Sequence, residues 1–142
     1  MSMYVKVTYD GKIESTSNYS PNKKLTSNVG LDGYCELVVE VKGGSISYYD
    51  NSFYNVSSRG KIKSIGDTQI KYFDDLCYSF CAGKVERIGN VELFYYNNEA
   101  GPAARGKVKY IDDILVEYYD NSYPSYKAGK PKKVGNMDIT IL

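Results

Sequence analysis

The chain has 142 residues, enough for one domain with a substantial buried core, and its 18 basic and 17 acidic side chains nearly balance. That balance argues against a surface for nucleic acid or anionic membranes, which requires an excess of positive charge. The absence of histidine removes the commonest general base and the commonest metal ligand. We therefore expect no enzyme, no cofactor, no metal, no nucleic-acid partner and no membrane partner.

The first twelve residues, MSMYVKVTYDGK, have the composition of a β-strand followed by a turn. They lack a basic segment followed by an apolar one, so we expect no secretory signal. No apolar run approaches the length of about 18 residues that a membrane-spanning helix needs. The sequence therefore predicts a cytoplasmic protein.

Residues 1–59 contain imperfect copies of a pattern that becomes regular later in the chain. GKIES at Gly11 resembles GKIKS at Gly60, and ISYYDNSFY at Ile46 resembles VEYYDNSYP at Val116. Between these copies, YCELVVEVKGGSISYYD predicts a hairpin that turns at its GG pair. Residues 15–28 are polar and contain a proline, which predicts one long loop, either functional or a mere insertion.

From residue 60 onward, one pattern returns every 23 residues. Each copy begins with Gly-Lys, has isoleucine or valine five residues after the glycine, and continues with Gly or Asp followed by Asp or Asn. A Gly-Asp or Gly-Asn pair between apolar runs is a two-residue turn signal, because glycine accepts positive φ, so each copy predicts a β-hairpin. The four copies begin at Gly60, Gly83, Gly106 and Gly129.

The strand after each turn alternates, and Val91, Leu93 and Tyr95 fall on one face. Before the turn, apolar residues are three apart, as in Val85 and Ile88, which strict alternation would place on opposite faces. We favour a bulge that returns both to one side; the alternative is a twisted hairpin that buries different faces at its two ends. The bulge is expected near Ser64, Arg87 and Tyr110.

The connections DDLCYSFCA, NNEAGPAAR and DNSYPSYKA keep one length while their compositions differ. A constant length is expected if each hairpin steps sideways to the next in one sheet. The sequence therefore predicts an all-β domain over residues 1–142, degenerate in 1–59 and regular in 60–142. We expect an antiparallel meander of roughly ten to twelve strands, closed or rolled into a barrel or sandwich, with a long single-layer sheet as the alternative.

The repeated columns, Gly-Lys followed by IG(N/D)xx(I/L/V)x(Y/F)(Y/F)(D/N), resemble the Ile-Gly-Asn…Tyr repeats of uncharacterised proteins from flavobacteria and cyanobacteria. The resemblance covers residues 61–142 and implies a bacterial β-repeat protein with no known chemical activity. The YYDN and GKVK segments are also similar to the Tyr-Asp repeats of large secreted shell-forming toxins. The connections here are longer than in those repeats, and the chain is too short to form a shell.

Neither the cysteines nor the acidic residues form a recognisable site. An odd number of cysteines, Cys35, Cys77 and Cys81, does not indicate a disulfide framework, and a metal site would need further ligands, so we expect unpaired thiols in a reducing compartment. Acidic and amide pairs recur where each hairpin ends; they could bind calcium, but capping of turns is the better explanation. These pairs begin at Asp50, Asp74, Asn97 and Asp120.

Aromatic residues recur at two neighbouring positions in successive hairpins, so they should form two rows on opposite faces of the sheet. One row, Tyr48, Tyr72, Tyr95 and Tyr118, is expected to be core. The other predicts an aromatic ladder that binds a partner if it is exposed; the alternative is that loops, a second layer or another subunit cover it. The ladder residues are Tyr49, Phe73, Tyr96 and Tyr119, with Phe94 nearby.

These observations predict a non-catalytic module that binds an unknown protein through an aromatic sheet face or a sheet edge. Self-association into a homo-oligomer is one form of that prediction. A carbohydrate-binding, lectin-like module that uses the same tyrosines is the alternative, and a purely structural repeat protein is a third.

Overall fold

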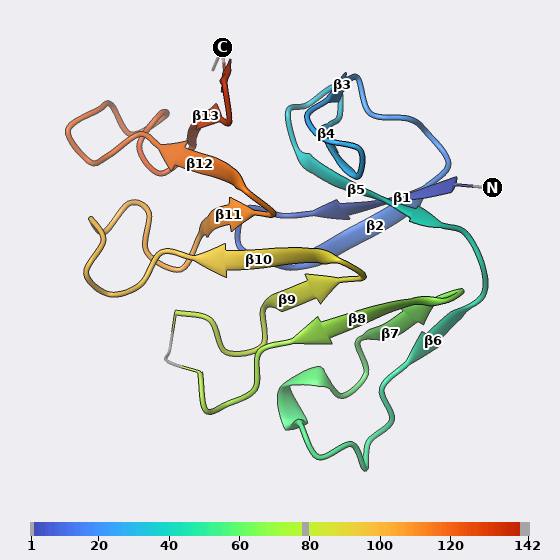
Figure 1. Cartoon of the computed structure of the whole chain (residues 1–142). Helices are drawn as coiled ribbons and strands as arrows, with labels where there is room; N and C mark the ends of the chain where they lie inside the picture. Colours follow the sequence, from blue (N-terminus) through green and yellow to red (C-terminus); the bar gives the residue numbers. More distant parts are fainter. Residues whose placement is uncertain (1, 78–79, 140–142) are drawn as a thin grey trace.

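The computed structural model describes residues 2–77 and 80–139, which form a succession of short β-strands (Figure 1). Within those ranges the only helical element is the short 3₁₀ turn η1 (Val56–Ser58). The predicted all-β class is confirmed. Fourteen strands are formed in these ranges, somewhat more than expected, and two of them, β3 (Lys23–Lys24) and β14 (Met137–Asp138), have only two residues.

The strands of the described residues form two antiparallel sheets, and neither of these closes into a barrel. The smaller sheet has the order β2-β1-β5-β4-β3, and the larger runs in chain order from β14 back to β6, which is the predicted meander. The remaining strands of the smaller sheet are β1 (Ser2–Val7), β2 (Ile13–Ser17), β4 (Val29–Leu31) and β5 (Leu37–Lys42). Those of the larger sheet are β6 (Ile46–Tyr48), β7 (Ile62–Ile65), β8 (Thr68–Tyr72), β9 (Val85–Ile88), β10 (Val91–Tyr95), β11 (Val108–Ile111), β12 (Ile114–Tyr118) and β13 (Pro131–Val134).

The four Gly-Lys copies start with the same backbone conformation. Their glycines have φ of 80°, 77°, 76° and 81° in chain order, in the left-handed region that glycine adopts without a Cβ clash. Gly11, which begins the imperfect GKIES copy, has φ of 82°. As Figure 1 shows, the two-residue turns lie along one side of the larger sheet and the long connections along the other.

Each regular hairpin has a bulge in its first strand, close to the predicted place. Tyr95 pairs with Val108 and Phe94 pairs with Tyr110, so Lys109 between them is the extra residue. The bulge turns both apolar residues of the strand inward: Val108 and Ile111 are completely buried. The equivalent extra residues elsewhere are Lys63, Glu86 and Lys132, and Glu14 in the Gly11 copy.

The buried side chains of the two sheets form one continuous hydrophobic core. Val5 and Val39 enter it from the smaller sheet, while Ile70, Leu93 and Val116 enter it from the larger one, and all are at most 1% exposed. A strand that buries only every second side chain requires a second layer against that face. The two sheets provide this layer for each other.

The predicted hairpin around the GG pair is wrong. β5 is central in the smaller sheet, between β1 and β4, so it has no free side for β6. The chain therefore crosses to the larger sheet through Gly43 and Gly44. The crossing packs closely on the first hairpin turn: a Cβ added to Gly44 would lie 2.5 Å from the Cα of Gly66. Likewise, the predicted loop 15–28 contains the end of β2 and all of β3.

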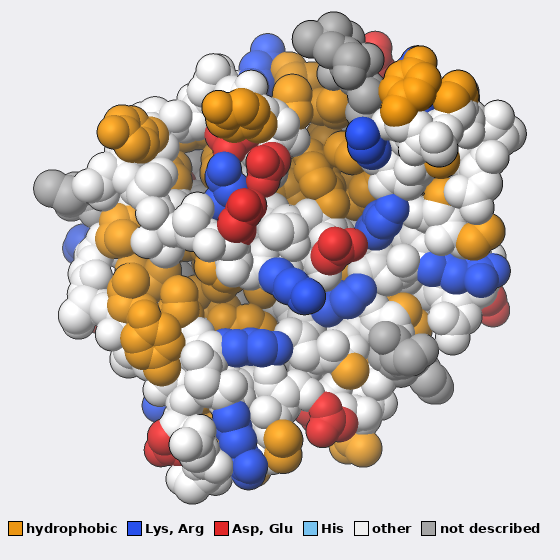
Figure 2. All heavy atoms as spheres, turned by 180° about the vertical axis from the view of Figure 1, so that it is seen from behind, with side chains coloured by type: hydrophobic (Ala, Val, Ile, Leu, Met, Phe, Trp, Pro, Cys, Tyr) orange, Lys and Arg blue, Asp and Glu red, His pale blue; other side chains and the backbone are white. Residues whose placement is uncertain are grey.

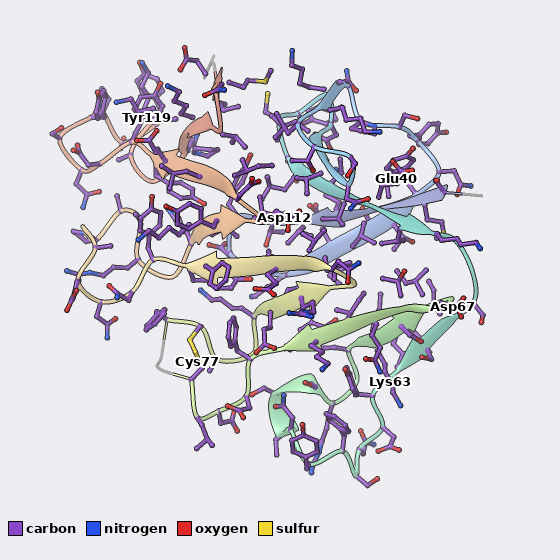
Figure 3. All side chains as sticks on the ribbon, viewed as in Figure 1. Glu40, Lys63, Asp67, Cys77, Asp112 and Tyr119 are labelled. Carbon is purple, nitrogen blue, oxygen red and sulfur yellow. A yellow bond between two sulfur atoms is a disulfide. The ribbon has the colours of Figure 1, made fainter. Side chains whose placement is uncertain are left out.

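The expectation that all three cysteines are free thiols is also wrong. Cys77 and Cys81 form a disulfide in the connection between β8 and β9 (Figure 3). Cys35 is free and half-buried. The spacing could not show this pairing, because it depends on the path of a connection whose equivalents in the other copies contain no cysteine.

One turn carries a residue that does not suit its backbone. Asp112, with φ of 56°, occupies the position held by Gly66, Gly89 and Gly135 in the other hairpins. Positive φ is confined to this first turn residue, the pattern of a type II′ turn, which favours glycine. We expect Asp112→Gly to raise the free energy of unfolding by about 1 kcal/mol, since it removes backbone strain.

Urea unfolding followed by circular dichroism measures this effect. The new glycine retains the backbone bond from residue 112 N to Glu92 O, whose equivalents occur at the other turns. The reverse change, Gly89→Asp, should lower the midpoint. A lower urea midpoint for Asp112→Gly than for the wild-type chain would contradict the conclusion that Asp112 strains this turn.

Candidate functional site

The inner row of tyrosines ties the two strands of each hairpin together. Tyr72, Tyr95 and Tyr118 point toward the core, and each hydroxyl donates a hydrogen bond to a backbone carbonyl two residues after the Gly of its own copy. The distances are 2.9 Å to Ile62 O, 2.5 Å to Val85 O and 2.7 Å to Val108 O. These bonds satisfy the only polar atom of each half-buried or buried ring.

The lysine of each Gly-Lys pair links its copy to the next one. Lys61 Nζ donates to Gly83 O at 2.7 Å, Lys107 Nζ donates to Gly129 O at 2.5 Å, and Lys84 makes the same bond with Gly106 O. We call Lys61, Lys84 and Lys107 the lysine ladder. Their Nζ atoms lie 5.1, 5.5 and 5.4 Å from the ring centres of the tyrosines of their own hairpins. The ladder thus combines a charge-assisted hydrogen bond with a cation–π contact in each copy.

Burial changes the acid–base behaviour of both rows. It lowers the pKa of Lys61, Lys84 and Lys107 and raises the pKa of Tyr72, Tyr95 and Tyr118. A tyrosine with a raised pKa keeps its proton in the folded chain at a pH where the unfolded chain loses it. Its contribution to stability is therefore complete below pH 10 and is lost as pH rises above that value.

We expect the unfolding midpoint to fall steeply between about pH 10 and pH 12, and tyrosinate absorbance to reach its full value only when the chain unfolds. Spectrophotometric titration, with circular dichroism on the same samples, measures both. Full ionisation of all tyrosines in a chain that is still folded would contradict the buried hydroxyl bonds.

The predicted aromatic ladder is not an exposed surface. Tyr49 is 7% exposed and its hydroxyl donates to Ile70 O at 2.6 Å; Tyr96 is half-buried and its hydroxyl donates to Val116 O at 2.8 Å. Both tyrosines use the hydroxyl to reach the next hairpin. They therefore hold neighbouring hairpins together as the lysine ladder does.

The other three candidate residues differ in exposure. Phe73 is half-buried and packs edge-on against Tyr95. Tyr119 is half-buried on the loop side of the sheet, where its ring lies 4.8 Å from that of Tyr123 (Figure 3). Phe94 is 47% exposed, and its role in binding stays a prediction.

The acidic and amide pairs at the hairpin ends cap turns. Asp50 Oδ1 accepts from Ser52 N at 2.9 Å, and Asp120 Oδ1 accepts from Ser122 N at the same distance. Asp74 and Asn97 accept in the same way from the amides two residues ahead. Within residues 2–77 and 80–139, no three His, Cys, Asp or Glu residues are grouped so that they could hold a metal ion.

The turn between β1 and β2 packs into the larger sheet and uses two of its amides. Val85 N donates to Gly11 O, and Val108 N donates to Tyr9 O, both at 2.8 Å. These amides belong to the bulged strands of the second and third copies and are free for such bonds because the bulge interrupts the ladder there. The ring of Tyr9 lies edge-on to that of Tyr118, and Gly11 lies against Tyr95.

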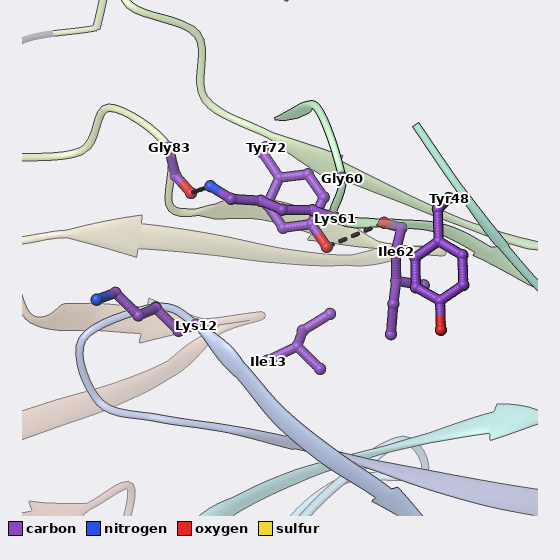
Figure 4. Close-up of a pocket in the computed structure, with 9 residues that line it drawn as sticks. Lys12, Ile13, Tyr48, Gly60, Lys61, Ile62, Tyr72 and Gly83 are labelled. Carbon is purple, nitrogen blue, oxygen red and sulfur yellow. Dashed lines mark hydrogen bonds between the residues drawn. The ribbon is translucent and has the colours of Figure 1, made fainter. Parts of the chain in front are cut away.

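The equivalent position in the first copy is open. It forms a cleft of about 320 Å³ beside the lysine ladder (Figure 4), and the described turn residues make no hydrogen bond to Ile62 N. The fourth copy has Pro131 at this position, which has no N–H to offer. The cleft is lined by Gly11, Lys12, Ile13, Tyr48, Gly60, Lys61, Ile62, Tyr72 and Gly83.

Two open sheet edges border this cleft. β2 is the edge of the smaller sheet and contributes Ile13, and β6 is the edge of the larger sheet and contributes Tyr48. The spacing placed Tyr48 in the buried row, but its side chain is 59% exposed, because no earlier hairpin of the larger sheet covers it. Figure 2 shows one face of the molecule, on which basic side chains lie close to patches of hydrophobic ones.

A larger groove of about 770 Å³ lies between the β3 region and β12–β14. Its lining mixes both signs of charge, with Lys23 and Lys133 near Asp113 and Glu117, and it contains no aromatic ring. It therefore offers neither a charge preference nor a stacking surface. The cleft beside Tyr48 is the better candidate site.

Sequence reasoning missed Lys12 and Lys61 as site residues. The available signal was the Gly-Lys copy at Gly11, which resembles the one at Gly60, but nothing in the sequence shows that the two copies face each other. None of the described residues belongs to a helix long and apolar enough to cross a membrane. Comparison with protein-family models, curated proteins and solved structures gives no match for this chain.

Proposed function

We propose that this protein is a non-catalytic binding module that takes a peptide segment of a partner protein in the cleft between β2 and β6. One observation carries the proposal. In the second and third copies, the position equivalent to the cleft is filled by a peptide turn, whose carbonyls accept hydrogen bonds from Val85 N and Val108 N. The first copy has the same glycine conformation and an equivalent tyrosine, Tyr72, but the chain's own turn does not fill the position beside it.

The two strand edges support the same proposal. An exposed edge presents unpaired N–H and C=O groups that an extended peptide can pair with, and pockets beside the edge select its side chains. β6 is an edge strand and all three of its residues are exposed, so this edge is accessible to an added strand. The ring of Tyr48 then provides an apolar surface with a polar end beside that strand.

The disulfide bears on where the protein works. Disulfides persist in oxidising compartments and are rare in the cytosol. The Cys77–Cys81 bond therefore favours an oxidising compartment over the cytoplasm expected from the sequence.

Selection from a displayed peptide library tests the function. We expect peptides that bind the wild-type chain and lose at least tenfold in affinity with Tyr48→Ser, since a buried aromatic contact is worth about 1.4 kcal/mol or more. Phe94→Ser is the matched control, because Phe94 is also an exposed aromatic residue of the larger sheet but does not line the cleft.

Other results would overturn the proposal. A loss with Phe94→Ser and none with Tyr48→Ser would place binding on the outer face of the sheet. Specific signals on a glycan array, with no peptide selected, would support the carbohydrate-binding alternative. Self-association that Tyr48→Ser abolishes would identify a second copy of the chain as the partner.

A further inference from the structure

We propose that the cleft recognises a carboxylate-bearing turn, an acidic residue followed by glycine, in the partner peptide. This inference rests on the proposed function and names the chemistry of its ligand. It is drawn from the chain's own turn, whose residues fill the equivalent positions in the neighbouring copies.

The chain's own turn shows which backbone fits such a position. Gly11 has φ of 82°, and a Cβ at this residue would lie 2.3 Å from the Tyr95 hydroxyl. Glycine is therefore required where the turn meets the tyrosine ring. In the cleft, the ring of Tyr72 takes the place of Tyr95, so a ligand with glycine at the contact fits for the same reason.

Charge indicates the residue before the glycine. Asp10 precedes Gly11, and its carboxylate acts on the lysines of the second and third copies: it raises the pKa of both Lys84 and Lys107 against the effect of burial. Among the described residues, no carboxylate acts on Lys61 in this way. Its charged neighbour is Lys12, which lowers the pKa of Lys61 further.

The cleft thus contains two cations and no acidic side chain in its lining. Figure 4 shows Lys12 on the β1–β2 turn and Lys61 just before β7, with Tyr48 at the other end of the cleft beside Ile62. A carboxylate bound near the two lysines would do there what Asp10 does in the next two copies. An approach of unlike charges in a partly desolvated site is stronger than one in open solvent.

The pentapeptide Thr-Tyr-Asp-Gly-Lys, with blocked ends and cyclised to hold the turn, is the probe. We expect it to bind the wild-type chain about ten times more tightly than its Asn-for-Asp version, as measured by calorimetry or by NMR shifts of Ile62 N–H. The version with alanine in place of glycine should lose binding affinity by a comparable factor. The preference for Asp should disappear in Lys12→Gln and weaken as salt is added.

Lys130→Gln is the matched control, because Lys130 is also an exposed lysine of a Gly-Lys pair and does not line the cleft. If the Asp and Asn peptides bind equally, the carboxylate inference is overturned while the peptide-binding function stands. If N-acetyl-aspartate binds as tightly as the cyclic peptide, the site binds small carboxylates, and the inference that it recognises a peptide turn is overturned. If neither cyclic peptide binds but the library yields peptides sensitive to Tyr48→Ser, only this inference fails; if the library also yields none, both fail.

Discussion

Gly11→Ala is expected to lower the free energy of unfolding by about 3 to 4 kcal/mol. A residue with a Cβ at φ of 82° costs about 1 to 2 kcal/mol in backbone strain, and the new methyl would overlap the buried ring of Tyr95 at 2.3 to 2.7 Å, which adds the cost of overpacking. The ring cannot move away easily, because its hydroxyl is bonded to Val85 O. Guanidinium unfolding measures the loss.

Gly60→Ala separates the two contributions. Gly60 has almost the same φ, 80°, but no atom lies within 4 Å of a Cβ added there. It should therefore show the strain alone, about 1 to 2 kcal/mol. Equal losses in the two variants would mean that the β1–β2 turn does not pack against Tyr95 as described.

Lys84→Met is expected to lower the free energy of unfolding by about 2 kcal/mol. Methionine retains most of the apolar contact with the ring of Tyr95 but removes both the cation over that ring and the bond to Gly106 O, which leaves a partly buried carbonyl without its donor. The loss should appear as a lower denaturation midpoint with an unchanged dependence on denaturant.

Lys130→Met is the control for that result. Lys130 belongs to the fourth Gly-Lys pair and is exposed, and residues 131–142 contain no further Gly-Lys pair whose glycine it could reach. Its replacement should change stability by less than about 0.5 kcal/mol, as is usual for a surface position. A loss in Lys130→Met as large as in Lys84→Met would show that the bonds between copies contribute nothing.

Local patterns were sufficient to predict the hairpins of the larger sheet. The two-residue turns carry glycine where φ is positive, and Val91, Leu93 and Tyr95 alternate because their strand buries one face only. The smaller sheet was not predicted. β1 pairs with β5, about 35 residues further along the chain, and no short-range signal fixes a partner at that distance.

The cleft was harder still to predict. Tyr48 and Tyr72 occupy matching positions in the sequence, but one is exposed and the other buried, because exposure depends on whether another hairpin lies beside the strand. The cleft also joins Lys12 to Lys61, which the chain separates by 49 residues. The exposure of the aromatic ladder could not be predicted for a related reason: the spacing gives a row of rings but does not show that the hydroxyls of Tyr49 and Tyr96 reach the next hairpin.

The bonds of the lysine ladder all point in one direction along the chain, because each lysine reaches the glycine of the copy that follows it. A 23-residue segment duplicated between two existing copies would supply a glycine carbonyl that accepts from the lysine before it and a lysine that donates to the glycine after it, so the array can be lengthened from within. Deletion of the last copy would instead remove an acceptor from the one before it. These four copies therefore tolerate an inserted copy between two of them better than removal of the copy that begins at Gly129.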